Sequence, residues 1–216
     1  MIANKMFANI ACAGTYPVAT APTAAAAGNG TVITLSDLNN SQWRSNGTYW
    51  RPLGGQQLVY SAAADCDAIT GGTGEVQLAI ATAGITVTIP AIVMAPAMEI
   101  RQSHSIIKTG TAGSVTQRIR QTNIAGTNLG YTTVIGTTII GARSSMILAA
   151  GAASGGNITL TNSLSGTTTA EQGTSTSAAI TITQAIASPL VLFPTIQNSS
   201  AADSTVVRSF KVWVRG

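Results

Sequence analysis

Charged side chains are scarce in this sequence. Only 8% of its 216 residues are Asp, Glu, Lys or Arg, against roughly a quarter in an average globular protein. The 11 basic and 7 acidic residues give a formal net charge of +4, and the basic residues are scattered from Lys5 to Arg215. Nucleic-acid binding requires Lys and Arg to be gathered on one face. The sequence therefore predicts no nucleic-acid partner.

Histidine and cysteine are nearly absent as well, which limits the metal and redox chemistry open to the chain. His104 is the only histidine, so a metal site built from several histidines is excluded. It lies in the alternating run Glu99–Ile107, which indicates a histidine on the face of a strand rather than a catalytic base. Cys12 and Cys66 form no C-x-x-C pair, so we expect two reduced, buried thiols.

The common catalytic motifs are also missing. The sequence contains no G-x-S-x-G nucleophile turn and no G-x-x-x-x-G-K phosphate loop. Asp65 and Asp67 form one close pair of acids, with an i, i+2 spacing that is compatible with a Ca²⁺ loop or a glycosidase pair. No further acid follows until Glu75, so we favour a turn-forming pair. We expect no enzyme activity, and therefore no catalytic, cofactor-binding or metal-binding residues.

Long hydrophobic runs are absent too. The most apolar stretch, Ile85–Ile100, is interrupted by Pro90 and Pro96 and is shorter than the ~20 residues that cross a bilayer. Near the N-terminus, the apolar run Met6–Ala13 is broken by Asn9, which argues against a signal peptide. We expect no membrane insertion.

The composition is instead rich in small and uncharged residues. Hydrophobic residues make up 45% of the chain and there are 22 glycines, so the chain is not of the disordered class, which combines low hydrophobicity with high net charge. Surface charge of both signs is what normally keeps a monomer dispersed. Uncharged Thr, Ser, Asn and Gln side chains cost less to desolvate than charged side chains when a subunit contact buries them. We therefore expect an assembled protein.

Short runs of Val, Ile and Thr, bounded by Gly, Asn and Ser, predict an all-β fold in three parts. Residues 1–29 contain Pro17 and Pro22 and lack strand alternation and helix caps, which indicates an extended N-terminal arm held by neighbouring subunits. Residues 30–61 form a small β-hairpin module. Residues 62–216 have the strand spacing of an antiparallel β-sandwich or jelly roll.

The module contains most of the large aromatic rings. Asn46-Gly47 predicts a two-residue hairpin turn that places Trp50 directly across from Trp43. Trp43, Tyr49 and Trp50 then form the core of the hairpin, an interpretation that we favour over a ligand-binding aromatic platform. The side chains of Arg44 and Arg51 are placed to stack on these rings. A last strand of the module is expected at Gln56–Ser61.

Ten candidate strands follow in the sandwich: Glu75–Ala81, Ile85–Ile89, Ala97–Lys108, Ser114–Ile124, Tyr131–Ile135, Ser145–Ala149, Asn157–Thr161, Ala178–Thr183, Leu190–Gln197 and Thr205–Arg215. Two of these strands show clear alternation. The last is expected to bury Val206, Phe210, Val212 and Val214, with Lys211, Trp213 and Arg215 on its other face. In Ser114–Ile124, Arg118 and Arg120 lie opposite Val115 and Ile119, so their guanidinium groups must meet acids, carbonyls, water or a neighbouring subunit.

Two stretches resemble a known family. Gly30–Leu38 followed by Gln42–Gly55 resembles the short hairpin module that precedes the jelly-roll head in fibre and virion-surface proteins of tailed bacteriophages. Thr205–Gly216 looks like the final strand of such heads, and Ile85–Pro90 looks like an opening strand. The resemblance implies a homotrimer carried on a virion, on the tail or the capsid surface, and assembled in the host cytoplasm.

The resemblance also implies roles for the two ends of the chain. The arm would anchor the protein to other tail or capsid proteins, with anchoring residues Met1, Met6, Phe7, Ile10, Tyr16 and Pro17. A short tail fibre or receptor-binding protein would touch a host-surface glycan or protein through its distal loops. The loops Gly110–Gly113, Gly151–Gly156 and Ser165–Ser177 carry no Trp or Tyr to stack on sugar. The chain also lacks a long fibre shaft, so a capsid-decorating, cement or head-fibre protein is the alternative.

Overall fold

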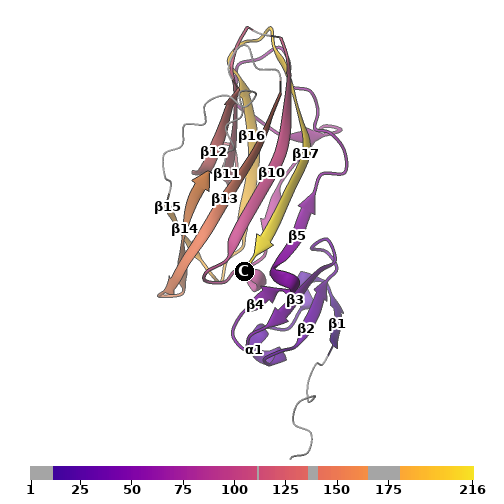
Figure 1. Ribbon diagram of the computed structural model, residues 1–216, viewed down its shortest axis with the longest axis vertical. Coiled ribbons are helices and arrows are strands. Elements are labelled where there is room, and N and C mark those ends of the chain that lie inside the picture. The colour runs from indigo at the N-terminus through magenta and orange to yellow at the C-terminus, as the bar shows by residue number, and fades with distance from the viewer. Residues whose placement is uncertain (1–11, 111, 136–140, 165–180) are drawn as a thin grey trace, which may run out of the picture.

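The computed structural model describes residues 12–110, 112–135, 141–164 and 181–216. It is elongated, with a small sheet at one end and two larger sheets facing each other over the rest of its length (Figure 1). Within the described residues the only α-helix is the four-residue α1, Ala24–Ala27, and no helix there is long and apolar enough to cross a membrane. The expected all-β class is confirmed, in the form of a β-sandwich with an added small sheet.

The small sheet, which we call the module, has four strands in the order β1-β2-β3-β4. Their bounds are Cys12–Tyr16, Val32–Leu35, Ser41–Ser45 and Trp50–Pro52. β1 pairs with β2 in parallel, and the short 3-10 helix η1, Val18–Thr20, and helix α1 connect them. The prediction of an extended arm up to residue 29 is therefore wrong for its second half, since residues 12–29 fold onto the module.

No helix cap was expected in this segment, but the structure contains one. Thr23 is the N-cap of α1, and its hydroxyl oxygen accepts a hydrogen bond from the amide of Ala26 at 3.2 Å. The hydroxyl of Ser45 donates to the carbonyl of Ala24 at 2.7 Å, which ties the helix to strand β3. A four-residue helix is too short to persist alone, so these tertiary contacts fix it in place.

The hairpin between β3 and β4 has a longer turn than predicted. Trp50 pairs with Ser45, and Trp43 pairs with Pro52, so the two tryptophans are not directly opposed. The turn spans four residues because the side-chain oxygen of Asn46 accepts from the amides of Thr48 and Tyr49, at 3.0 and 2.8 Å. Both tryptophans are still buried, at 0% and 1% exposure.

The larger of the two main sheets has six strands in the order β15-β14-β13-β10-β17-β5. Their bounds are Thr181–Ala185, Asn157–Leu164, Gly141–Ser154, Glu99–Thr109, Ser204–Arg215 and Gln56–Ser61. The strand at Gln56–Ser61 has the predicted bounds but a different partner. It pairs with β17 instead of the module sheet, so it is an edge strand of the sandwich.

The second main sheet has five strands in the order β12-β11-β16-β6, with β9 also paired to β16. Their bounds are Asn128–Ile135, Val115–Gln121, Leu190–Asn198, Val76–Gln77 and Val87–Ile89. A two-stranded sheet of β7, Ala79–Ile80, and β8, Ala83–Gly84, and the 3-10 helix η3, Ala91–Val93, complete the fold. The buried apolar side chains of the module and of the sandwich belong to one cluster.

Strand β17 changes its buried face partway along. Ser209 has a φ of 54° and lies where the pairing with β10 shifts register. This bulge inserts one residue into the alternation. Phe210, Val212 and Val214 are buried as predicted, but before the bulge the buried residues are Thr205 and Val207, while Val206 is only half-buried. The prediction for Val206 was wrong because simple alternation carries no sign of a bulge.

The long strands give the molecule two distinct ends. At the base, beside the module, β10 begins and β17 ends, and the amide of Gly216 donates to the carbonyl of Gly55 at 3.3 Å. At the tip, farthest from the module, the turns from β10 to β11 and from β16 to β17 lie together (Figure 1). The module and the C-terminal residue are therefore at the base.

Candidate functional site

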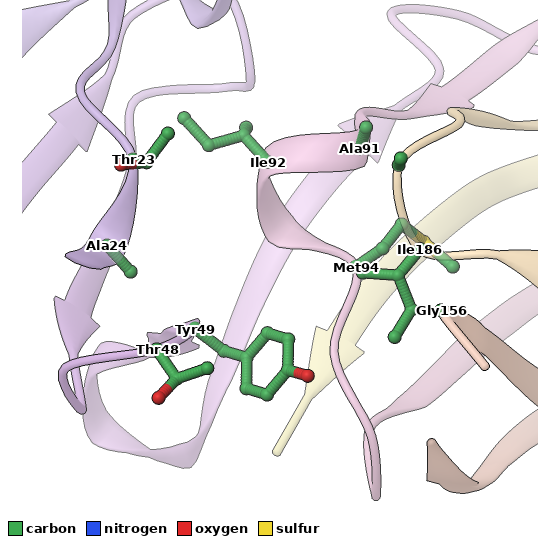
Figure 2. Close-up of a pocket in the computed structure, with 10 residues that line it drawn as sticks. Thr23, Ala24, Thr48, Tyr49, Ala91, Ile92, Met94, Gly156 and Ile186 are labelled. Atoms are coloured by element: carbon green, nitrogen blue, oxygen red, sulfur yellow. The ribbon is translucent and has the colours of Figure 1, made fainter. Parts of the chain in front are cut away.

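A pocket lies at the base, where the module meets the sandwich. Its volume is about 570 Å³, within the ~300–1,000 Å³ range of typical ligand pockets. Figure 2 shows the module residues on one side of it and the sandwich residues on the other. The lining residues from the module are Thr23, Ala24, Thr48 and Tyr49, and those from the sandwich are Ala91, Ile92, Met94, Gly156, Ile186 and Ala187.

The module wall is held by the two local features described above. The Thr23 cap fixes the start of α1, so Ala24 is placed at the pocket. The Asn46 turn fixes Thr48 and Tyr49, and the amide of Asn46 donates in return to the carbonyl of Tyr49 at 3.1 Å. Tyr49 is only half-buried. Its ring therefore lines the pocket and does not complete the hairpin core predicted for it.

The sandwich wall is formed by η3 and by two turns. Pro90 precedes η3, and its carbonyl accepts from the amide of Val93 at 3.1 Å. This turn buries Val93 and leaves Ile92 half-buried against the pocket, where Figure 2 shows it extending toward Thr23. The amide of Ile186 donates to the carbonyl of Gly156 at 3.0 Å, which holds the two turns together.

The chemistry of the pocket is uncharged. None of its lining residues is ionised at neutral pH, and its polar side chains are the hydroxyls of Thr23, Thr48 and Tyr49. Arg51 is not among the lining residues, and its guanidinium donates to the carbonyl of Pro96 at 2.7 Å. Its Cζ lies 5.9 Å from the centre of the Tyr49 ring, so the predicted stacking occurs for this arginine. A pocket of this kind favours apolar, uncharged groups.

Arg44 pairs with Arg51 across the hairpin. The two arginines line a smaller hollow of about 220 Å³.

A charged cluster lies on the outer face of the five-stranded sheet. The carboxylate of Glu75 accepts hydrogen bonds from Arg118 at 3.3 Å and from Arg120 at 2.7 and 2.5 Å. It also accepts a hydrogen bond from the hydroxyl of Thr195. Burial raises the pKa of Glu75, but these hydrogen bonds and the two positive charges outweigh it and hold the pKa below 4.5. The predicted need of Arg118 and Arg120 for a partner is thus met by one acid.

A second polar cluster closes the tip. The side chains of Lys108 and Asp203 are fully buried, with 3.5 Å between Nζ and Oδ2. Asp203 accepts from the amides of Ala112 and Gly113 at 3.0 and 2.7 Å, and Lys108 donates to the carbonyl of Gly113 at 2.5 Å. Burial raises the pKa of Asp203, but the two amides and the ammonium together hold it below its usual value. The cluster joins the two tip turns into one unit.

The single histidine lies inside the sandwich. His104 is 3% exposed and its ring stacks near Phe210, with 6.4 Å between ring centres. Its Nδ1 and the amide nitrogen of Gln102 are 2.7 Å apart. Among the described residues, no group bonds to His104 Nε2 or Gln102 Oε1. Burial lowers the pKa of His104 to about 4, so the ring is neutral at pH 7. This is a strand-face histidine, as expected, with its side chain directed into the core.

The two acids beside Cys66 have different partners. Asp67 accepts from the amides of Ala81 and Thr82 at 2.8 and 2.7 Å, while Asp65 pairs with the exposed Arg208 at 2.9 Å. Asp67 therefore supports the turn between β7 and β8 instead of forming a local turn with Asp65. Cys66 is a free, buried thiol, and burial and the two acids raise its pKa to about 11. Within the described parts of the chain, no three His, Cys, Asp or Glu side chains are placed to hold a metal ion.

The predicted anchoring residues fall partly within the structure. Met1, Met6, Phe7 and Ile10 lie outside the described residues, as does the loop Ser165–Ser177. Tyr16 is half-buried at the end of β1, where its carbonyl accepts from the amide of Ser36 at 2.9 Å, and the next residue, Pro17, is exposed.

Sequence reasoning missed the pocket and the tip cluster. Both combine segments far apart in the chain, and the only local signals were a capping threonine and a buried position for Lys108 in an alternating strand.

Comparisons with known proteins identify no family. No protein-family model matches the sequence. No curated protein matches it either.

Proposed function

We propose that this protein is a structural protein of a tailed-bacteriophage virion, most simply a short homotrimeric tail fibre or receptor-binding protein with a jelly-roll head. It is attached to other virion proteins at its base and presents its tip to a host-surface glycan or protein. In this proposal it performs no catalysis.

The observation that carries the proposal is that the elongated molecule has two different ends, the base and the tip. The module and the last residue lie at the base, and the antiparallel strands β10 and β17 run from there to the tip turns. A protein that is attached at one end and makes contact at the other needs this arrangement. The sequence resemblance in the hairpin and in the last strand supports the same interpretation.

The construction of the tip also supports a presenting role. The buried Lys108–Asp203 pair and the Asn198 side chain, which donates to the carbonyls of Ile69 and Asp203, fix the turns from within. A recognition surface built on fixed turns loses little conformational entropy on binding. The surface side chains at these turns are then available for contact.

Three measurements test the proposal. Sedimentation of the purified full-length chain should give about three chain masses, and a monomer at micromolar concentration would contradict the homotrimer. Gold-labelled antibody against the chain should bind at the tail of purified virions, and the free protein should slow phage adsorption to its host. Labelling of the capsid without any effect on adsorption would instead support a decoration or cement role. Absence of the chain from virions would reject both.

A further inference from the structure

The pocket at the base is suited to an apolar partner. Its walls come from two parts of the molecule, and its lining has no charge. Ile92 and Tyr49 are only half-buried there, while Ala187 is exposed at the rim. Covering these groups would remove apolar surface from water, which favours association.

The N-terminal segment of the chain has side chains of the required chemistry. Residues 6–36 contain no Asp, Glu, Lys or Arg, and Met6, Phe7 and Ile10 are large and apolar. β1 begins at Cys12, so eleven residues precede it. Met6, Phe7 and Ile10 lie six, five and two residues before Cys12, so a fully extended chain carries them about 20, 17 and 7 Å beyond the start of β1.

The position of β1 indicates which copy provides the segment. β1 and β4 are the opposite edges of the module sheet, about 14 Å apart at ~4.8 Å per strand. Helix α1 is tied to the sheet between them by Ser45 and by Thr31, whose hydroxyl donates to the carbonyl of Ala27 at 2.6 Å. Ile10 of the same copy, within about 7 Å of the start of β1, would not reach the pocket residues beside β4. Ile10 of an adjoining copy can approach them from outside the molecule.

We propose that Met6, Phe7 and Ile10 of a neighbouring copy of this chain fill the pocket between the module and the sandwich. Each subunit then holds the next one at the base. This inference rests on the proposed function, because it requires the protein to be a homo-oligomer. It adds the contact that joins the subunits and the residues that make it.

Cross-linking between distinguishable copies tests the contact directly. Two differently tagged full-length chains are co-expressed in a Cys12→Ser background, one carrying Phe7→Cys and the other Ile92→Cys. Mild oxidation should join the two tags by a disulfide. The control replaces Ile92→Cys with Ile124→Cys, since Ile124 is 43% exposed and lies on the turn between β11 and β12. Equal cross-linking of the control would contradict the proposal, as would no cross-link between tags.

A chain that carries both Phe7→Cys and Ile92→Cys shows which copy provides the N-terminal segment. Disulfides between chains support the proposal. Disulfides formed only within single chains would show that the segment folds back on its own subunit and would overturn it.

A charge at the rim of the pocket provides a second test. Ala187 is exposed, so Ala187→Arg leaves the folded core intact but places a cation beside the apolar partner. Sedimentation should show association at least tenfold weaker than for the unmodified chain, and the matched variant Ile124→Arg should not change it. A trimer unaffected by Ala187→Arg would reject this contact but leave the proposed assembly standing. A monomeric unmodified chain would reject the proposed function itself.

Discussion

Trp50 tests how the module and the sandwich are joined. Its side chain is 1% exposed, and its ring nitrogen donates to the carbonyl of Pro22 at 3.0 Å, which links β4 to the segment before α1. A tryptophan buries ~150–250 Å², and loss of a buried Trp side chain costs about 3–5 kcal/mol. We expect Trp50→Ala to lower the free energy of unfolding of the module by this amount. Trp50→Phe keeps most of the ring and should cost about 1–2 kcal/mol, largely for the lost hydrogen bond.

Limited proteolysis with trypsin locates the effect. Arg44 and Arg51 are the only basic residues between Lys5 and Arg101, and the bond after Arg51 precedes proline, which trypsin does not cleave. Trp50→Ala should therefore be cut first after Arg44, leaving a resistant fragment that begins at Ser45. Its β5 strand remains paired with β17. Early cleavage after Arg101 or beyond would refute this reasoning, since it would show that module and sandwich unfold together.

Three further substitutions give independent tests. Glu75→Gln removes the acid shared by Arg118 and Arg120 and should lower the free energy of unfolding by about 1–2 kcal/mol at pH 7. The pKa of Glu75 in the folded protein lies below 4.5, so this difference from the unmodified chain should shrink as the pH falls through that lower pKa. Unfolding in urea at several pH values measures it. The pKa of His104 is lowered from 6.5 to about 4, so between these values only the unfolded state is protonated, and stability should fall by about 1.4 kcal/mol for each unit by which the pH is lowered. An unchanged slope in His104→Leu would contradict this. Gly110→Ala should lower Tm by several degrees in calorimetry, because φ is +99° and a Cβ would lie 2.4 Å from Asp203 Oδ1; an unchanged Tm would show that the tip turn can adjust.

The fold class followed from the sequence because short alternating runs directly report strands with one buried face. The register errors arose at a turn and at a bulge that the alternation pattern does not mark. Asn46 gave a turn signal, but nothing in the sequence shows that its oxygen binds two amides and lengthens the turn. Ser209 similarly shifts the buried face of β17 without a local marker. The strand at Gln56–Ser61 was located correctly, but its partner β17 lies some 150 residues later, beyond what local pattern can report.

The candidate site was less predictable than the fold. Tyr49 was assigned to the hairpin core because aromatic residues cluster in this short segment, yet the longer turn moves it to the pocket. The charged cluster was half-predicted, since Arg118 and Arg120 clearly required a partner. That partner is Glu75, at a sequence separation of 43 and 45 residues. Clusters of this kind depend on tertiary packing, so the sequence shows that a charged residue needs a partner but not which residue the partner is.

The attachment of β5 to the edge of the larger sheet has a mechanical consequence. β5 lies antiparallel to β17 and follows directly after the module. A pull between base and tip would load the hydrogen bonds of this pair along the strand direction, so that all of them resist at once. A connection at right angles to the strands would instead let them open one after another. The pairing of β5 with β17 therefore resists tension along the length of the molecule, and β5 is the strand that connects the module to the sandwich.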